Sequence, residues 1–423
     1  MQKKRASMHD GPLADLFRQT DSSRDSTPEP AAEVAARAKP SKPLRAVVKD
    51  VPASRTAARP VPLSPGGDSG AYLAVIRVVG VGGAGVNAVN RMIESEIRGV
   101  EFLAVNTDAQ QLALADAAVK IHIGAHLTEG LGSGSDPEVG RRAAEESDAS
   151  IREALRGSDL VFVAAGEGGG TGTGAAPVVA RIARELGALT VGIVTTPFGF
   201  EGSRRAAQAD DGITKLARSV DTLVTIPNDR LLAVLDRRTS MVDAFRVADD
   251  ILRQGVQGIC DLITTPGLIN LDFADVRTIM SDAGSALMGI GMASGPSRGR
   301  EAARRAVTSP LVGHGIQGAT GILLSVVGGD SLGLHEAMEI AEVVRGAAHH
   351  DANIIFGATV DERLGDQVWV TVIATGFDRE RIASEANVEN RSPEAPADPF
   401  EIETTPRFQL DASGDFELPD FLR

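Results

Sequence analysis

Residues 166–177 read GEGGGTGTGAAP, a run of glycines with two threonines, Thr171 and Thr173. Glycine lets the backbone approach a ligand closely and turn successive N–H groups toward it. The apolar residues 160–165 before this run are typical of a buried strand, and residues 178–186 after it have helical spacing. A helix that starts behind such a loop adds the positive end of its dipole. The pattern predicts a phosphate-binding loop, and a flexible linker is the less favoured interpretation.

The residues around the glycines limit which kind of phosphate-binding loop this can be. The GxxxxGK[ST] pattern is absent, because no lysine follows them. A second glycine run, residues 80–87 (GVGGAGVN), also follows an apolar stretch. A dinucleotide-binding dehydrogenase would place an acidic ribose ligand about 20 residues further on, and Asp108 lies near that distance. That hypothesis leaves the run at 168–174 unexplained, so it stays the weaker one.

A possible base-binding face lies on the apolar-patterned stretch 241–265, which predicts one long helix. Phe245 and Asp249 are four residues apart and so share a face of that helix. An aromatic ring can stack on a purine, and a carboxylate can accept two hydrogen bonds from the N1–H and N2–H₂ groups of guanine, which adenine lacks. Asn228 would be a companion donor. A core position for Phe245 is the alternative.

Two carboxylates follow this helix. Asp272 and Asp275 are three residues apart, at the start of an expected helix 273–280, with Asn270 just before them. Asp272 is a natural N-cap for that helix. Carboxylates at this spacing also share one face of the first turn and can orient or polarise water. Both roles can hold together.

Strands and helices alternate from residue 71 onward, which predicts a parallel sheet with helices on both faces. A smaller α+β domain should follow the long helix, with strands near 286–292, 321–327, 353–360 and 367–375. The expected organisation is an N-terminal arm (1–70), a nucleotide-binding domain (71–240), the long helix (241–265), a second domain (266–378), a linker (379–414) and a terminal peptide (415–423). The arm and the linker are expected to be disordered because they are rich in Pro and polar residues.

Composition excludes several function classes. The 423 residues are 43% hydrophobic and carry a net charge of −14, which argues against nucleic-acid binding through a basic surface. The single cysteine, Cys260, excludes an internal disulfide framework and fits a reducing compartment. No signal peptide and no membrane-spanning run are expected, so the sequence predicts a cytoplasmic protein.

From about residue 76 to 377 the sequence resembles the FtsZ family, the tubulin-like cell-division GTPases. The resemblance rests on motifs in the family's order: 80–90 (GVGGAGVNAVN), 104–108 (AVNTD), 130–134 (GLGSG), 168–174 (GGGTGTG), 197–205 (PFGFEGSRR), 226–232 (IPNDRLL) and 270–276 (NLDFADV). The last residues, 418–423 (LPDFLR), also resemble the family's partner-binding tail. The glycine string 168–174 is the most specific of these motifs.

The resemblance implies a tubulin/FtsZ-like fold that binds GTP or GDP, with Mg²⁺ carried by the nucleotide and no metal ligands of the chain's own. It implies that Glu201 and Arg205 contact the ribose and phosphate side of the nucleotide. It also implies that Asn228, Phe245 and Asp249 bind the guanine base. The implied phosphate contacts come from the two glycine loops: Gly82, Gly83, Ala84, Gly85, Val86, Asn87, Gly169, Gly170, Thr171, Gly172, Thr173 and Gly174. The implied catalytic residues, which enter the neighbouring subunit's site, are Asn270, Asp272 and Asp275.

The resemblance further implies a polymer of the chain with itself, at the septal ring on the inner face of the membrane. Partners would bind the tail through Leu418, Pro419, Phe421 and Leu422, without nucleic acid and without direct membrane insertion. One departure concerns residues 130–140, GLGSGSDPEVG, where the family's usual loop is similar to GLGAGANPEVG. The added hydroxyls and the added charge leave a second hypothesis open, a paralogue that binds GTP and modulates filaments with little turnover.

Overall fold

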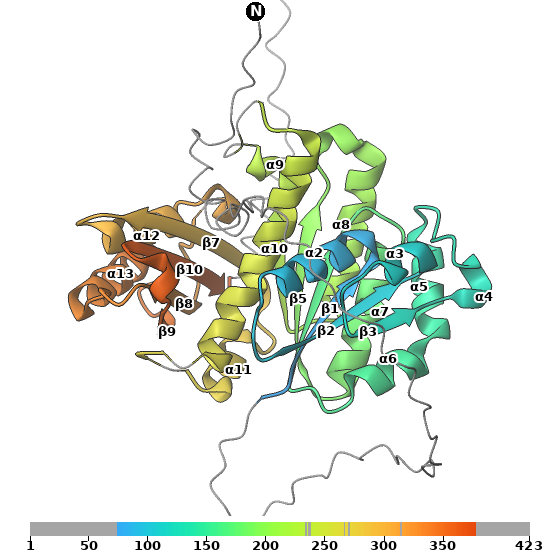
Figure 1. The fold of residues 1–423 in the computed structure, drawn as a ribbon, viewed down its shortest axis with the longest axis horizontal. Helices are drawn as coiled ribbons and strands as arrows, with labels where there is room; N and C mark the ends of the chain where they lie inside the picture. Colours follow the sequence, from blue (N-terminus) through green and yellow to red (C-terminus); the bar gives the residue numbers. More distant parts are fainter. Residues whose placement is uncertain are drawn as a thin grey trace, which may run out of the picture. The chain divides into compact units, whose positions relative to one another are not determined.

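The computed structural model describes residues 74–377 apart from 233–234, 236–237, 266, 270 and 314. Its strands form one ten-stranded sheet in the order β3-β2-β1-β4-β5-β6-β7-β10-β8-β9 (Figure 1). The strands are β1 (Ile76–Val81), β2 (Val100–Asn106), β3 (Val119–His122), β4 (Leu160–Gly166), β5 (Leu189–Thr196), β6 (Thr222–Pro227), β7 (Gly284–Ser294), β8 (Gly321–Gly328), β9 (Asn353–Val360) and β10 (Gln367–Thr375). All neighbouring pairs are parallel except those of β10 with β7 and β8.

The α-helices cover both faces of this sheet, as the alternating pattern predicts. They are α2 (Gly82–Glu94), α3 (Ala109–Ala113), α4 (Ala125–Thr128), α5 (Pro137–Glu146), α6 (Asp148–Leu155), α7 (Thr171–Glu185), α8 (Ser203–Ala217), α9 (Asn228–Leu231), α10 (Met241–Thr264), α11 (Phe273–Met280), α12 (Arg298–Val307) and α13 (Leu334–Ala347). Short 3-10 turns span η2 (Gly199–Glu201), η3 (Pro310–Val312) and η4 (Glu362–Leu364). One core cluster joins the sheet to α2, α10 and α11, and a second joins the other face to α5, α6, α7 and α8.

The long helix α10 carries an apolar stripe along most of its length, although the pattern also predicts Val242 in it and this residue is 61% exposed. Val247, Leu252, Val256 and Ile259 on it are all buried. Ser240 caps its N-terminus by accepting a hydrogen bond from the backbone N–H of Asp243 at 3.1 Å. Because α10 packs against strands of both expected domains, it acts as a spine for the described part of the chain. The strands of these two domains belong to one sheet, since β7 pairs with β6 over three residues and with β10 along most of its length.

One expected helix is wrong in its extent. The sequence pattern predicts a single helix over 137–156, whereas the structure has α5 and α6 with a break at Ser147. Ser147 has φ −101° and ψ 15°, and its hydroxyl accepts a hydrogen bond from the backbone N–H of Gly124 at 3.3 Å. A serine whose side chain binds another segment favours a helix end, which periodicity alone does not reveal.

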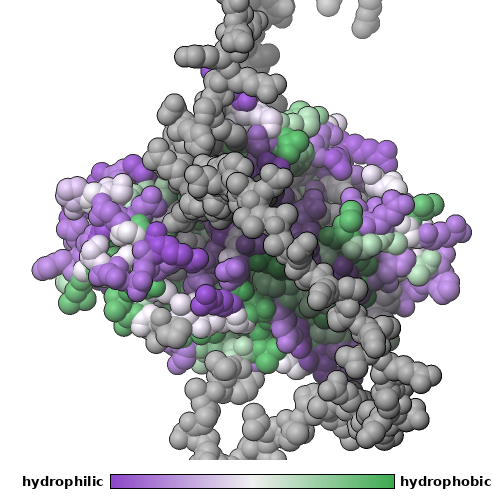
Figure 2. Space-filling view, viewed as in Figure 1, coloured by the Kyte–Doolittle hydropathy of each residue, from purple (hydrophilic) through white to green (hydrophobic). Residues whose placement is uncertain are grey.

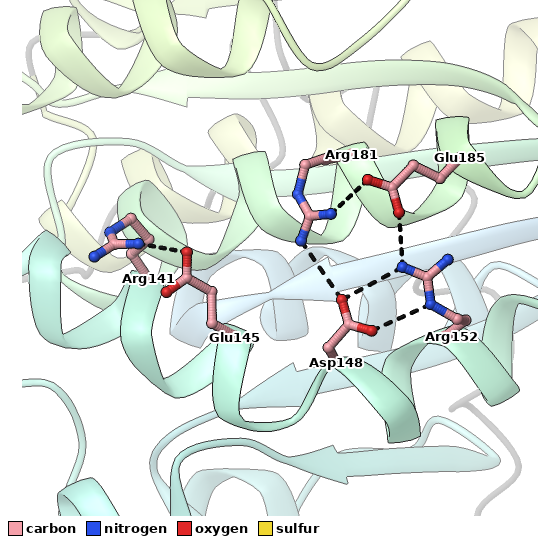
Figure 3. Close-up of polar contacts among 6 residues, drawn as sticks. All are labelled: Arg141, Glu145, Asp148, Arg152, Arg181 and Glu185. Carbon is pink, nitrogen blue, oxygen red and sulfur yellow. Dashed lines mark hydrogen bonds and ion pairs between the residues drawn. The ribbon is translucent and has the colours of Figure 1, made fainter.

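The surface of α6 and α7 carries a closed set of ion pairs, shown in Figure 3. Arg152 bridges Asp148 at 3.1 Å and Glu185 at 2.7 Å. Arg181 reaches the same two carboxylates at 3.5 Å and 2.5 Å. All four side chains are about a third or more exposed, so the network contributes little to stability as separate pairs and mainly fixes the register of the two helices.

Candidate nucleotide-binding site

The loops that carry the sequence motifs meet at the carboxyl edge of the sheet. Val81 at the end of β1 is level with Val105 in β2 and with Ala165 in β4. At the next strands Thr196 is level with Pro227. The segments that follow β1, β2, β4, β5 and β6 therefore leave the sheet side by side. This is the edge at which open α/β sheets bind their ligands.

Two helix N-termini converge at this edge without side-chain caps. α2 begins at Gly82 after Val81, α7 begins at Thr171 after Gly170, and neither flanking residue caps its helix through a side chain. The helices touch at their starts, because a Cβ added to Gly82 would lie 2.7 Å from the backbone nitrogen of Gly172. The first N–H groups of a helix have no partner inside it, so two such ends side by side form an anion-binding site.

The residues of the first glycine loop, 80–87, differ in their exposure to solvent. Ala84 and Asn87 are exposed and Gly83 is half-buried, so they are accessible to a ligand. Gly85 has no room for a side chain, since its Cβ would lie 2.3 Å from the carbonyl oxygen of Ala164. Val86 is 3% exposed and packs in the core, which leaves only its backbone for a ligand. The loop thus offers backbone groups and one amide side chain.

The second glycine loop starts its helix earlier than residues 178–186 suggest, because Thr171–Gly174 already form the first turn of α7. The Thr173 hydroxyl accepts a hydrogen bond from the backbone N–H of Gly168 at 2.8 Å and so braces the loop. A Cβ at Gly174 would lie 1.9 Å from the carbonyl oxygen of Pro137, so this glycine permits close packing on α5. Gly169 is half-buried, whereas Gly170, Thr171 and Gly172 are buried, so this part of the loop has little exposed surface of its own.

Sequence reasoning missed Thr107 and Ser133 as site residues. The Thr107 and Thr171 hydroxyl oxygens are 2.6 Å apart, and the Ser133 hydroxyl oxygen is 3.0 Å from that of Thr171. Thr107 stands in the AVNTD motif directly after β2, which was the available signal. The added charge of the substituted loop is held at a helix end, since the Asp136 carboxylate caps α5 by accepting from the backbone N–H of Glu138 at 2.9 Å.

Glu201 and Arg205 form an ion pair across the η2–α8 junction. Glu201 also accepts a hydrogen bond from the backbone N–H of Phe198 at 3.0 Å, which fixes its carboxylate in the turn. The side chain of Arg205 is 47% exposed, so within the described part of the chain the donors that do not pair with Glu201 are accessible to an anionic ligand. The structure therefore gives Glu201 a positioning contact and Arg205 an accessible charge.

Asp249 lies on α10 opposite Arg91 of α2, with 3.6 Å between its Oδ2 and the arginine Nε. Its side chain is 17% exposed. Burial raises the pKa of Asp249 to about 6, although Arg91 acts in the opposite direction. A carboxylate that is desolvated and only loosely paired is suited to accept hydrogen bonds from a ligand.

Phe245 lies one helical turn before Asp249 and is partly exposed and partly packed against other rings. It is 39% exposed, while its ring edge packs against Phe198 at 5.5 Å and Phe200 at 6.5 Å between centroids. Asn228, at the start of α9, is 5% exposed, and its Oδ1 has no hydrogen-bond partner among the described residues. Leaving a buried polar atom unpaired is costly, so a polar ligand at this position would relieve it.

The two aspartates that are predicted to be catalytic follow the C-terminal end of α10. Asp272 caps α11 by accepting a hydrogen bond from the backbone N–H of Asp275 at 2.8 Å, and both carboxylates are exposed. Asn270 lies outside the described residues. From Asp249 to the end of α10 at Thr264 is 15 residues, about 22 Å of helix. Figure 1 shows α11 beside one end of α10 and α9 beside the other.

The glycine run 166–177 contains one buried carboxyl group, that of Glu167. Glu167 is 5% exposed, and neither oxygen has a hydrogen-bond partner of normal geometry among the described residues. Burial raises the pKa of Glu167 to about 7, an effect that the Thr173 hydroxyl offsets only in part. A Cβ at Gly212 of α8 would lie 2.3 Å from its Oε2, so the carboxyl is packed against that helix.

These features together fit a nucleoside phosphate: uncapped helix ends for phosphates, an accessible arginine, and a ring, a carboxylate and an unpaired amide for a base. The dehydrogenase hypothesis loses its ribose ligand, because the Asp108 carboxylate caps α3 by accepting from the backbone N–H groups of Gln110 and Gln111 at 2.9 and 3.0 Å.

Comparisons with known proteins agree with this geometry. Residues 75–236 match the model of the Tubulin/FtsZ family GTPase domain, and residues 284–378 match that of the FtsZ family C-terminal domain. An empty FtsZ dimer from M. jannaschii is 46% identical, with a TM-score of 0.70 over 72% of this chain and 89% of that one. A point mutant of the M. jannaschii FtsZ is also 46% identical, with a TM-score of 0.70 over 72% of this chain and 92% of that one.

A more distant likeness concerns the fold alone. CetZ2 from Haloferax volcanii, solved as a GTPγS-bound protofilament, is 21% identical, with a TM-score of 0.63 over 75% of this chain and all of that one. The two family matches and the 46% identity to FtsZ over 72% of this chain therefore lead to one conclusion: the chain belongs to the FtsZ family of tubulin-like GTPases.

Proposed function

We propose that this chain is a self-assembling GTPase that polymerises head to tail into filaments of the cytokinetic ring, with GTP hydrolysed at the interface between subunits. The observation that carries the proposal is the separation of the two halves of the site. The residues suited to bind the base, Phe245 and Asp249, lie in the N-terminal half of α10, whereas Asp272 and Asp275 lie beyond its C-terminal end. About 22 Å of helix lies between them. One molecule cannot bring both to one phosphate, but two stacked molecules can.

In this scheme GTP brings its own Mg²⁺, and the chain supplies positioning and electrostatics. The helix ends of α2 and α7 hold the phosphates, Arg205 adds a cation, and Asp249 accepts hydrogen bonds from guanine. Asp272 and Asp275 of the next subunit orient the attacking water. Hydrolysis then occurs only within a filament, so it drives filament turnover.

Concentration dependence tests the proposal. We expect the GTPase rate per molecule to rise steeply with protein concentration and to level off once filaments predominate, because the site is complete only between two copies. Phosphate release and sedimentation should be measured on the same samples, with GDP as the control that does not support assembly. A rate per molecule that stays constant down to concentrations at which no polymer sediments would overturn the shared site.

Nucleotide choice gives a second prediction. We expect GTP to bind more tightly than ATP, and Asp249→Asn to lower the affinity for GTP by about ten- to a hundredfold, since a hydrogen bond to a charged group contributes roughly 1.5–3 kcal/mol. Titration with both nucleotides measures this. Asp250→Asn is the matched control, because Asp250 pairs with Arg253 and Gln254 on its own helix. Equal affinity of the parent protein for ATP and GTP would contradict the assignment.

The alternative of a paralogue with little turnover keeps the same nucleotide site. It is favoured by the substituted loop at residues 130–140. The structural likeness to CetZ proteins shows the fold alone and does not favour either proposal. The two proposals differ in rate: the paralogue would bind GTP and show no polymer-dependent phosphate release.

Cellular placement is part of the proposal as well. We place the filaments in the cytoplasm at the septum, on the inner face of the membrane, held by partner proteins that bind Leu418, Pro419, Phe421 and Leu422. These four residues and the N-terminal arm lie outside the described residues. Within the described residues no helix is long and apolar enough to cross a membrane. On the visible face in Figure 2 hydrophilic and apolar residues are mixed in small groups.

A further inference from the structure

Three hydroxyls from three separate loops meet at the start of α7. Thr107 follows β2, Ser133 stands in the turn before α5, and Thr171 is the first residue of α7. Thr171 is the centre of the group, with its hydroxyl oxygen 2.6 Å from that of Thr107 and 3.0 Å from that of Ser133. All three residues are buried. The cluster therefore joins the loops around the phosphate site without charge and without bulk water.

The Ser133 hydroxyl fills a space that depends on glycine. A Cβ added to Gly170 would lie 2.2 Å from the Ser133 oxygen, so this oxygen rests directly against the Cα of the residue before Thr171. Within the described residues, Thr171 is the hydrogen-bond partner that the structure gives to the hydroxyls of both Ser133 and Thr107.

A count of protons shows what the serine adds. Each hydroxyl has one proton and two lone pairs. When Ser133 and Thr107 both donate to Thr171, both lone pairs of the Thr171 oxygen are filled. The Thr171 hydroxyl then cannot donate its own proton to either neighbour, so this proton is available to a third acceptor. Thr171 stands at a helix N-terminus whose first N–H groups lack partners within the helix, so an anion bound at the helix end would be such an acceptor.

We propose that Ser133 is a positioning residue for nucleotide binding, which donates to Thr171 so that the Thr171 hydroxyl presents its proton to a phosphate oxygen. The inference rests on the proposed function in that the ligand is a nucleoside triphosphate. It adds a residue that tunes affinity through Thr171 and does not touch the nucleotide. The substituted loop thereby strengthens the phosphate site instead of weakening it.

A double-mutant cycle on the full-length chain tests this. GTPγS binding should be titrated for the parent, Ser133→Ala, Thr171→Val and the double variant, at protein concentrations too low for assembly. We expect Ser133→Ala to weaken binding roughly two- to tenfold in the parent background, which is the range of one neutral hydrogen bond. In the Thr171→Val background the same change should have no effect. Ser135→Ala is the matched control, because Ser135 is an exposed serine in the same loop, and its binding should equal that of the parent.

Two results would overturn the positioning role. Ser133→Ala could bind GTPγS as tightly as the parent, or it could lose the same factor in both backgrounds, as a general loosening of the loop would cause. Thermal unfolding of each variant identifies such loosening separately. If the parent binds GTPγS but never releases phosphate from GTP, the proposed hydrolysis is overturned. The binding cycle still tests the role of Ser133 in that case. A parent that does not bind GTPγS would overturn both.

Discussion

Replacing Glu167 with glutamine should change how the stability of this protein depends on pH. The carboxyl is 5% exposed, and burial raises its pKa from 4.5 to about 7. Between these two values the folded state holds a proton that the unfolded chain has released. The free energy of unfolding therefore falls as the pH rises through this window, by up to about 3 kcal/mol from this one group. Below pH 4.5 both states are protonated and the group has no effect.

Glutamine has the shape of the protonated acid and does not ionise. We expect Glu167→Gln to lose this part of the pH dependence, so that its stability relative to the parent rises by about 3 kcal/mol between pH 4.5 and pH 8. Urea unfolding of both proteins at several pH values measures it, and the comparison cancels all other titrating groups. Glu153→Gln is the control, since Glu153 is an exposed glutamate paired with Arg156. If the stabilities of Glu167→Gln and the parent depend on pH in the same way, the pKa of Glu167 is not raised in the folded state.

The carboxyl edge of the sheet could be predicted from the sequence because its causes are local. Each motif follows an apolar stretch and precedes a helical one, and parallel strands must end at the same edge. The sequence predicts that the glycines at 82 and 172 let the backbone approach a ligand, which stays a prediction; the structure shows that these two glycines approach each other. Strands 353–360 and 367–375 were placed at their observed bounds for the same reason, since both are short β-branched runs between turn residues.

What the sequence could not reveal depends on contacts between distant segments. Ser133 and Thr107 meet Thr171 across 38 and 64 residues, and no periodicity in the chain encodes such a meeting. The break at Ser147 depends on Gly124, which is 23 residues away. The apolar side chain of Val86 is compatible with a loop and with a core position. In the structure it is 3% exposed, so it belongs to the core. The domain boundaries stay a prediction, because the strands of the two expected domains share one sheet.

The largest effect on activity is expected at Asp272. In the proposed filament this carboxylate enters the neighbour's site and orients the attacking water, a role whose loss costs about 10²- to 10⁴-fold in rate. Asp272→Ala should therefore abolish measurable turnover while GTP binding is retained, since the nucleotide-binding residues lie at the other end of α10. Filaments formed with GTP should persist instead of disassembling. Phosphate release and sedimentation over time measure both effects.

Asp272 also caps α11, and the two roles can be separated. Asparagine is as good an N-cap as aspartate, but it carries no charge, so Asp272→Asn should keep the stability of the parent and lose the turnover. Asp272→Ala should lose both, with about 1 kcal/mol less stability because the N–H of Asp275 then has no side-chain acceptor. Asp282→Asn, at an exposed aspartate that pairs with Arg184, is the control. If Asp272→Asn turns over GTP at the parent's rate within filaments, the carboxylate serves only to cap the helix, and the water must be oriented by another group.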